Sequence, residues 1–292
     1  MDQAERLRKM ISMQESDQPS ARVITVTSGK GGVGKSSVSV NLAIELTKAG
    51  KRVVILDADF GLANIEVMLG IRPQYNIGDL IYKDKTIEEI VTKGPLGIGF
   101  ISGGSGVQEL VNLDSNQVNQ LIQKLSKLDS IADVIIIDTG AGISNTVLEF
   151  VLFSSEILLV VTSEPTSITD AYALLKVLNR KKVFNEQEKT LSILANRVKN
   201  INEGKELFQK LSVVADKFLN LKLNYLGCVP NDQLMQKAVL SQQPVTLAYP
   251  KALATEAFTS ISEGILCQET AVQKDNVGIT NVFLKLIRRR RK

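Results

Sequence analysis

The sequence predicts an α/β protein built on a doubly wound, mostly parallel sheet with helices on both faces. Short apolar runs recur along the chain; they are rich in leucine and β-branched residues and lack the polar alternation of a half-exposed strand. Longer amphipathic stretches separate the runs, as expected where helices connect parallel strands. Functional loops are therefore expected at the carboxyl ends of the strands.

The elements follow one another in the order that this fold class requires. The expected strands lie at 23–28, 53–57, 97–102, 134–138, 157–163, 191–197 and 224–229. The helix expected at 36–49 has helical apolar spacing and ends at Gly50, a residue that commonly terminates helices. A short helical segment at 2–11 and a polar linker precede the first strand. We expect three parts: an N-terminal motif and linker at 1–20, a folded domain at 21–270 and a C-terminal amphipathic helix at 271–292.

Composition excludes several kinds of chemistry. The chain of 292 residues has no histidine, so neither an imidazole general base nor a histidine metal ligand is available. Its two cysteines, Cys228 and Cys267, are far apart and outside any C-x-x-C spacing, which argues against a disulfide framework, a zinc site or an iron–sulfur cluster. No apolar run could cross a bilayer and no secretory signal opens the chain, so we expect a cytoplasmic protein.

The positive charge is concentrated at one end of the chain. The net charge is +4, and because residues 288–292 are all basic, the preceding 287 residues sum to −1. A nearly neutral body argues against a general nucleic-acid surface, so we expect no nucleic-acid partner.

A phosphate-binding signature lies between the first strand and the first long helix. Gly29-x4-Gly34-Lys35-Ser36 has the spacing of a P-loop, in which inward-facing N–H groups surround an anion. The candidate nucleotide-binding residues of this loop are Gly29, Gly31, Gly32, Val33, Gly34, Lys35 and Ser36. Lys35 would reach the β and γ phosphates, and the Ser36 hydroxyl would ligate Mg²⁺. Phosphate binding alone leaves a second lysine, Lys30, without an explanation.

Three aspartates follow apolar strands. Asp57 ends the strand at 53–57, Asp59 lies two residues further on, and Asp138 ends the strand at 134–138. Beside a P-loop, one carboxylate can hold Mg²⁺ directly or through water, and another can orient the attacking water. A single aspartate at a strand end often only caps the next turn, but three together favour a site. Spacing does not settle which of Asp57 and Asp59 does the chemistry.

Several motifs resemble one family of nucleotide hydrolases. They are KGGVGKSS, DADFGLANIEVMLG at 57–70, DTGAG at 138–142, SEPTSITDAYALLK at 163–176 and PNDQ at 230–233. Together they resemble the MinD/ParA family of deviant-Walker ATPases over roughly residues 21–270. The resemblance implies ATP and ADP as ligands, Mg²⁺ as cofactor and an ATP-dependent homodimer.

The resemblance also implies roles for single residues. Lys30 matches the signature lysine that contacts the partner's ATP across the dimer, which makes hydrolysis depend on dimerisation. Asp59 matches the water-orienting residue, Asp57 and Asp138 match switch positions around Mg²⁺ and water, and Ser37 matches the α-phosphate contact. Asp170 matches an acid that pairs with the signature lysine in one state, or is an ordinary first-turn acid. The residues that match adenine-contacting loops, or are ordinary loop residues, are Asn196, Arg197, Pro230 and Asp232.

The C-terminal stretch has the pattern of a helix that lies in a membrane interface. Its apolar face comprises Ile279, Val282, Phe283 and Leu286, and its basic face includes Lys285 and Arg288. An anionic membrane surface would bind such a face, with about 1 kcal/mol from each basic residue. Proteins of the MinD type end in a membrane-targeting helix, which favours this interpretation. The alternative is a helix packed on the body with its basic residues in solvent.

The N-terminal stretch resembles a motif of the flagellar branch of the family, the FlhG, YlxH and FleN proteins. The matching residues are Asp2, Gln3, Ala4, Leu7 and Arg8. In that branch the motif engages FlhF, a GTPase of the signal-recognition-particle type, and a helix this short would order only on a partner. The alternative is a disordered start of the chain.

The expected function is therefore an ATP-dependent dimerisation and membrane-association switch. The resemblance implies control of flagellar number and placement through the FlhF GTPase and flagellar C-ring proteins, with the ATP-bound form peripheral at the inner face of the cell membrane. Three alternatives remain: a ParA-type DNA- or cargo-positioning ATPase, an iron–sulfur carrier ATPase and a nucleotide-binding scaffold without turnover.

Overall fold

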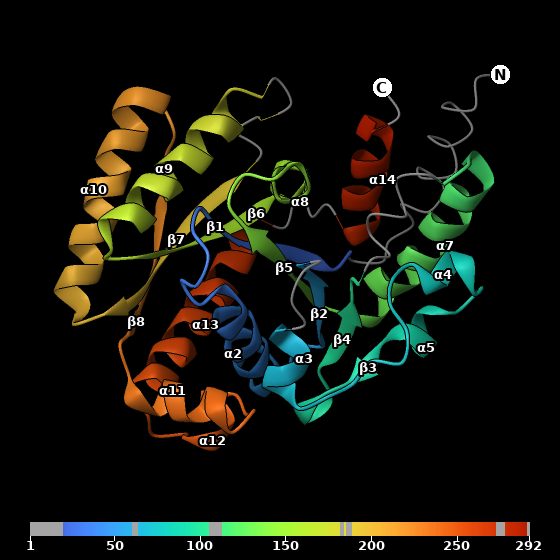
Figure 1. Ribbon diagram of the computed structural model, residues 1–292, viewed down its shortest axis with the longest axis horizontal. Coiled ribbons are helices and arrows are strands. Elements are labelled where there is room, and N and C mark those ends of the chain that lie inside the picture. The colour runs from blue at the N-terminus through green and yellow to red at the C-terminus, as the bar shows by residue number, and fades with distance from the viewer. Residues whose placement is uncertain are drawn as a thin grey trace.

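The computed structural model describes residues 20–59, 64–104, 113–181, 184, 189–272 and 278–290 (Figure 1). The helical segment expected at 2–11 and almost all of the expected linker lie outside these residues. Within them the chain forms one sheet with helices on both faces, so the predicted fold class is confirmed.

The sheet is eight-stranded, in the order β3-β4-β2-β5-β1-β6-β7-β8. The pairs are parallel except for β3 with β4, at the edge of the sheet. Because β1 lies between β5 and β6, the chain winds outward in both directions from the strand that precedes the P-loop. The strands are β1 Arg22–Ser28, β2 Val53–Ala58, β3 Thr92–Lys93, β4 Gly99–Ser102, β5 Val134–Ala141, β6 Glu156–Thr162, β7 Thr190–Val198 and β8 Asn224–Pro230.

Each predicted run forms a strand, but β4 begins two residues later than predicted, β5 runs three residues past its predicted end, and β3 was not predicted; the other ends agree within one residue. The strand expected at 97–102 begins at Gly99, because Pro95–Gly97 form a 3₁₀ turn in which Leu96 has a φ of 55°. The antiparallel β3 has two residues, too few to produce a sequence pattern.

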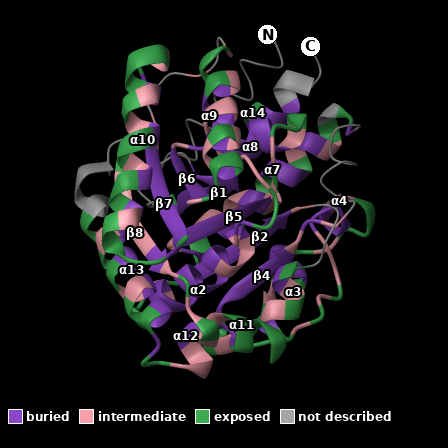
Figure 2. Cartoon of the chain, turned by 60° about the vertical axis from the view of Figure 1, so that its left-hand side comes forward, coloured by how far each residue is buried: buried purple, intermediate pink, exposed green. Residues whose placement is uncertain are grey.

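The helices form two layers with separate apolar cores. One layer comprises α2 Lys35–Lys48, α3 Asn64–Leu69, α11 Gln233–Leu240, α12 Val245–Ala248 and α13 Leu253–Val272. The other comprises α4 Asp79–Tyr82, α5 Ile87–Ile90, α7 Ser115–Ile131, α8 Asn145–Phe153, α9 Pro165–Asn179, α10 Ile201–Leu219 and α14 Ile279–Arg290. Figure 2 shows the central strands buried and the outer faces of the helices exposed.

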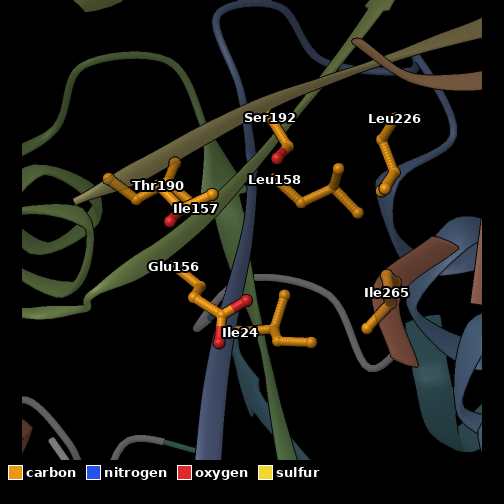
Figure 3. Close-up of a pocket in the computed structure, with 8 residues that line it drawn as sticks. All are labelled: Ile24, Glu156, Ile157, Leu158, Thr190, Ser192, Leu226 and Ile265. Atoms are coloured by element: carbon orange, nitrogen blue, oxygen red, sulfur yellow. The ribbon is translucent and has the colours of Figure 1, made fainter. Parts of the chain in front are cut away.

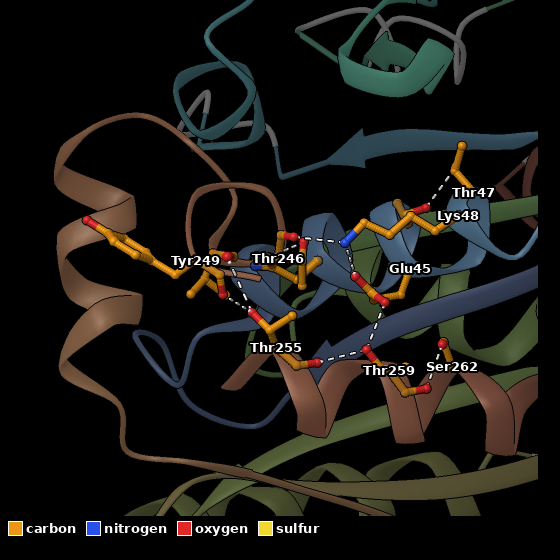
Figure 4. A network of polar contacts seen from close by, with 11 residues as sticks. Glu45, Thr47, Lys48, Thr246, Tyr249, Thr255, Thr259 and Ser262 are labelled. Carbon is orange, nitrogen blue, oxygen red and sulfur yellow. Dashed lines mark hydrogen bonds and ion pairs between the residues drawn. The ribbon is translucent and has the colours of Figure 1, made fainter. Parts of the chain in front are cut away.

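The helix that follows the P-loop is tied to the end of the domain by polar contacts (Figure 4). Buried Glu45 on α2 accepts hydrogen bonds from Lys48 at 2.7 Å and from Thr259 on α13 at 2.9 Å. Asn41 accepts from the backbone and the hydroxyl of Thr246 at 3.1 and 3.0 Å. A satisfied buried network of this kind fixes α2 against α12 and α13.

A buried ion pair lies at the amino end of β1. Arg22 donates to both carboxylate oxygens of Glu156 at 2.6 and 2.7 Å and to the carbonyl of Ile265 at 2.7 Å. The cavity beside this pair, shown in Figure 3, has a volume of about 10 Å³. That is about the least space that holds one water molecule, so we assign no ligand to it.

The C-terminal helix α14 is docked on the body. The face expected to meet a membrane is fully buried against α7 and α8, and Phe283 meets Phe150 edge to face with ring centroids 5.9 Å apart. Lys285 is exposed, and the side chain of Arg288 lies outside the described residues. The alternative of a packed helix therefore describes this conformation. No described helix is long and apolar enough to cross a bilayer.

Candidate active site

The P-loop connects β1 to α2 and is held from two sides. A Cβ at Gly29 would lie 2.2 Å from the backbone carbon of Asp170, so only glycine lets α9 approach the loop this closely. Gly34 has a φ of 93° and lies against Asn196, whose side-chain amide donates to the carbonyl of Val33 at 2.7 Å. Asn196, expected at the adenine, therefore supports the loop in this structure.

Lys35 and Ser36 lie beside Asp138 at the centre of the site. The Asp138 carboxylate is buried and accepts from the hydroxyls of Ser36 and Ser39, each at 2.7 Å. Burial lowers the pKa of Lys35, while the charges of Asp138 and Asp59 oppose that shift. Ser39 lies one helical turn after Ser36, and sequence reasoning missed it because no motif marks that position.

The three aspartates meet as the strand order requires. Asp57 and Asp138 are register partners on β2 and β5, and the backbone N–H of Asp59 donates to Asp57 at 2.9 Å. Burial raises the pKa of Asp57 to about 8, and the charges of Asp138, Asp59 and Glu66 add to the shift. Burial raises the pKa of Asp138 to about 6, opposed by its serine hydrogen bonds and by Lys35. The carboxylates therefore outnumber nearby cations, an arrangement that a bound divalent cation would stabilise.

This donor set fits Mg²⁺ better than a metal held by protein groups alone. Among the described residues no group of three or more histidine, cysteine, aspartate or glutamate side chains could hold a metal ion. Mg²⁺ typically takes one or two protein oxygens and completes its shell with water and substrate phosphates. Ser36, Asp57 and Asp138 offer oxygen donors of that kind next to the P-loop.

Lys30 is held by residues that sequence reasoning did not select. Its ammonium donates to the carboxylate of Glu164 at 2.5 Å and to the hydroxyl of Thr166 at 2.7 Å. Asp170, the expected acid, instead packs its backbone on Gly29. The side chains of Lys30 and Glu164 are 34% and 60% exposed, so the pair is open to solvent and to exchange. The hydrogen bond from Lys30 lowers the pKa of Glu164.

The remaining candidates lie around the same edge of the sheet. Arg197 is exposed with a φ of 56°, and Pro230 ends β8. Asp232 accepts from the backbone of Leu234 at 2.8 Å and of Ala254 at 3.1 Å, which caps α11 and ties it to the start of α13. Adenine contact by these residues stays a prediction.

The remaining P-loop residues differ in their exposure to solvent. Ser37 is half-buried, and Val33 is buried. Gly31 and Gly32 are exposed at the tip of the loop. The motif at Asp2, Gln3, Ala4, Leu7 and Arg8 lies outside the described residues.

Comparison with known proteins assigns the chain to a family. Residues 20–266 match the ParA family, under the description "NUBPL iron-transfer P-loop NTPase". The chain is 43% identical to the antiactivator FleN of Pseudomonas aeruginosa over 84% of its own length and 86% of that protein. It is 32% identical to the flagellum site-determining protein YlxH of Helicobacter pylori over 98% of each chain.

A solved structure agrees with the fold. The septum site-determining protein MinD of Pyrococcus horikoshii, in complex with Mg-ADP, superposes with a TM-score of 0.66 at 22% identity, over 87% of this chain and 99% of that one. With the P-loop and its aspartates, these matches define the class of protein as a P-loop ATPase. The chain belongs to the ParA/MinD family.

Proposed function

We propose that this ATPase is a switch that dimerises on ATP, then associates with the membrane, and regulates the number and placement of flagella. The flagellar role is supported by the similarity to YlxH, which is named as a flagellum site-determining protein, and to FleN, which is named as an antiactivator. The observation that carries the switch is the position of Lys30, which is bound to Glu164 and Thr166 at the exposed edge of the P-loop.

Hydrolysis would use groups that the fold already brings together. Lys35 would bind the β and γ phosphates, and Ser37 the α phosphate. Ser36, Asp57 and Asp138 would hold Mg²⁺, which would supply positive charge beside the phosphates when bound. Asp59 would orient the attacking water. Lys30 would leave Glu164 and reach the ATP of the second protomer, as an arginine finger does.

The dimer surface would include the P-loop edge. Gly31 and Gly32 are exposed there, together with Ala141 at the end of β5 and Ile143 in the segment that follows it. Ile143 is 51% exposed although it is apolar. The backbone of Gly142 donates to Ser28 at 2.9 Å, so this segment lies beside the base of the loop. A second copy placed on this edge would cover Ile143 and receive Lys30.

Membrane association would use α14 in a released form. Docked, its apolar face is buried; released, the same face and its basic residues would enter the interface of an anionic membrane. Two helices in one dimer bind far more strongly than one, which makes association depend on ATP. The protein would then be peripheral at the inner face of the cell membrane.

The proposed partners follow the similarity to the flagellar relatives. They are an FlhF-type GTPase, through the motif at 2–8, and flagellar C-ring proteins. A ParA-type DNA-positioning role is the second candidate, and the nearly neutral body argues against it.

The test is ATP-dependent co-sedimentation with anionic vesicles, comparing wild type with Lys30→Ala in the presence and absence of excess random DNA. Binding that requires both ATP and Lys30 and ignores DNA supports the switch. Binding to DNA in place of vesicles, weakening steeply with salt, would assign the protein to the DNA-positioning class.

A further inference from the structure

The docked helix α14 begins at a residue that cannot cap it. The carbonyl of Gly278 accepts from the backbone N–H groups of Asn281 at 3.1 Å and Val282 at 3.4 Å, so Gly278 occupies the position before the first turn. Helices usually place a serine, threonine, aspartate or asparagine there, whose side chain binds the free N–H groups. Glycine has no such side chain.

A residue from another helix supplies the cap. Asp129 on α7 accepts from the backbone N–H of Ile279 at 2.9 Å and of Thr280 at 3.3 Å, and from the Thr280 hydroxyl at 2.5 Å. The contact joins residues 150 apart in the sequence. A Cβ at Gly278 would lie 2.6 Å from the Asp129 carboxylate, so glycine is needed for the carboxylate to reach the helix end.

Apart from this contact, the position of Asp129 is unfavourable for a charged carboxylate. It lies in the last turn of α7, where the helix dipole disfavours a negative charge. Burial raises its pKa, against the hydrogen bonds from Thr280 and Ile279. While α14 is docked, its three hydrogen bonds to the carboxylate oppose both effects. When α14 leaves, the carboxylate regains water and the three hydrogen bonds are lost.

We propose that Asp129 is a latch that sets the equilibrium between docked and released α14. The apolar face of α14 determines where the helix lies, and the Asp129 cap determines how often its first turn opens. The membrane consequence rests on the function proposed above, whereas the latch itself can be tested without a membrane.

The first test is amide hydrogen exchange of the full chain without nucleotide or vesicles. Asp129→Ala removes the acceptor, and Gly278→Ala places a Cβ against it. Each variant should speed amide exchange across 279–287 by roughly two- to thirtyfold, the range for a lost cap. Asp129→Asn keeps one of the two acceptor oxygens but turns an N–H₂ group toward a backbone N–H, so its exchange should fall between wild type and Asp129→Ala. The control is Asn200→Ala, which removes the cap of α10 and should leave α14 unchanged. Unchanged exchange in Asp129→Ala would overturn the latch.

The second test is nucleotide-free co-sedimentation with vesicles of phosphatidylcholine and phosphatidylglycerol. Asp129→Ala should bind more than wild type by a similar factor. If exchange rises but no variant binds vesicles even with ATP, the latch stands and the membrane function fails. If wild type binds with ATP while Asp129→Ala shows no gain without it, the latch does not control the membrane equilibrium and the proposal is wrong.

Discussion

Lys30 and the C-terminal helix α14 are both held by the body of the molecule, but through contacts of very different strength. Lys30 meets Glu164 and Thr166 at an exposed edge, where water competes for every partner. Ion pairs of this kind contribute little to stability. Helix α14 buries six apolar side chains almost completely: Ile279, Val282, Phe283, Leu284, Leu286 and Ile287. Burial of each such side chain contributes roughly 1.5–3 kcal/mol.

This difference suggests a division of labour. An exposed ammonium can exchange one oxygen partner for a phosphate at little cost. In the proposed dimer, nucleotide and the second protomer would therefore reorganise the loop edge directly. Helix α14 leaves its groove only if another apolar environment accepts it. Dimerisation alone offers no such environment, whereas a bilayer does. Nucleotide should therefore control Lys30, and lipid should be needed to release α14.

The largest effect is expected at the nucleotide site, from the variant Asp59→Ala. Turnover should fall roughly 10²- to 10⁴-fold, the usual contribution of a group that positions or accepts a proton, while ATP-dependent dimerisation persists. Phosphate release and size-exclusion chromatography with ATP measure the two effects. The matched control is Asp216→Ala, an exposed aspartate on α10. A monomeric Asp59→Ala profile with ATP would remove Asp59 from its assigned role.

The packing of α14 on the body of the molecule is tested by Phe283→Ala. Truncation of a buried phenylalanine typically costs 3–5 kcal/mol, so docking should weaken by roughly 100-fold or more. Exchange across 279–287 should rise further than in Asp129→Ala, because packing contributes more than the cap. Lys285→Ala, on the exposed side of the same helix, should change nothing. Equal exchange in Phe283→Ala and wild type would mean that burial does not hold the helix.

The pH dependence of stability tests the buried carboxylates. The folded protein raises the pKa of Asp57 from 3.8 to about 8, so it retains a proton that the unfolded chain releases. The stability that this proton confers is lost as the pH rises through that window. Without metal and nucleotide, wild type should melt at a lower temperature at pH 8 than at pH 5. Asp57→Asn should flatten this difference, and an unchanged profile would contradict the assignment.

The smallest effect is expected for Glu164→Gln. Loss of the partner charge frees Lys30, so half-maximal dimerisation should need at most a few-fold less ATP. Light scattering across an ATP titration measures the shift, with Glu206→Gln on α10 as the control. A shift beyond about tenfold would show that the loop-edge contact is not weak, and the contrast with α14 would disappear.

What the sequence could predict depends on the range of the interactions. The strands, the P-loop and the three aspartates were predictable because continuous apolar runs and local spacing define them. The contact between Lys30 and Glu164 was not, because it needs β6 to lie beside β1, and no local pattern specifies strand order. The burial of α14 was left open for a related reason. One amphipathic pattern suits lipid and a protein groove equally well, and only α7 and α8 decide between them.

The seating of α14 has a practical consequence for work on the isolated protein. A chain cut before residue 278 would lose the face that is proposed to bind lipid, but it would also uncover the apolar floor that includes Phe150. Exposed apolar grooves of that kind promote self-association and capture foreign helices. A shortened protein could therefore sediment by aggregating, with no vesicle involved. Charge reversal at Lys285 leaves the groove filled. It therefore separates lipid binding from nonspecific self-association more cleanly than truncation does.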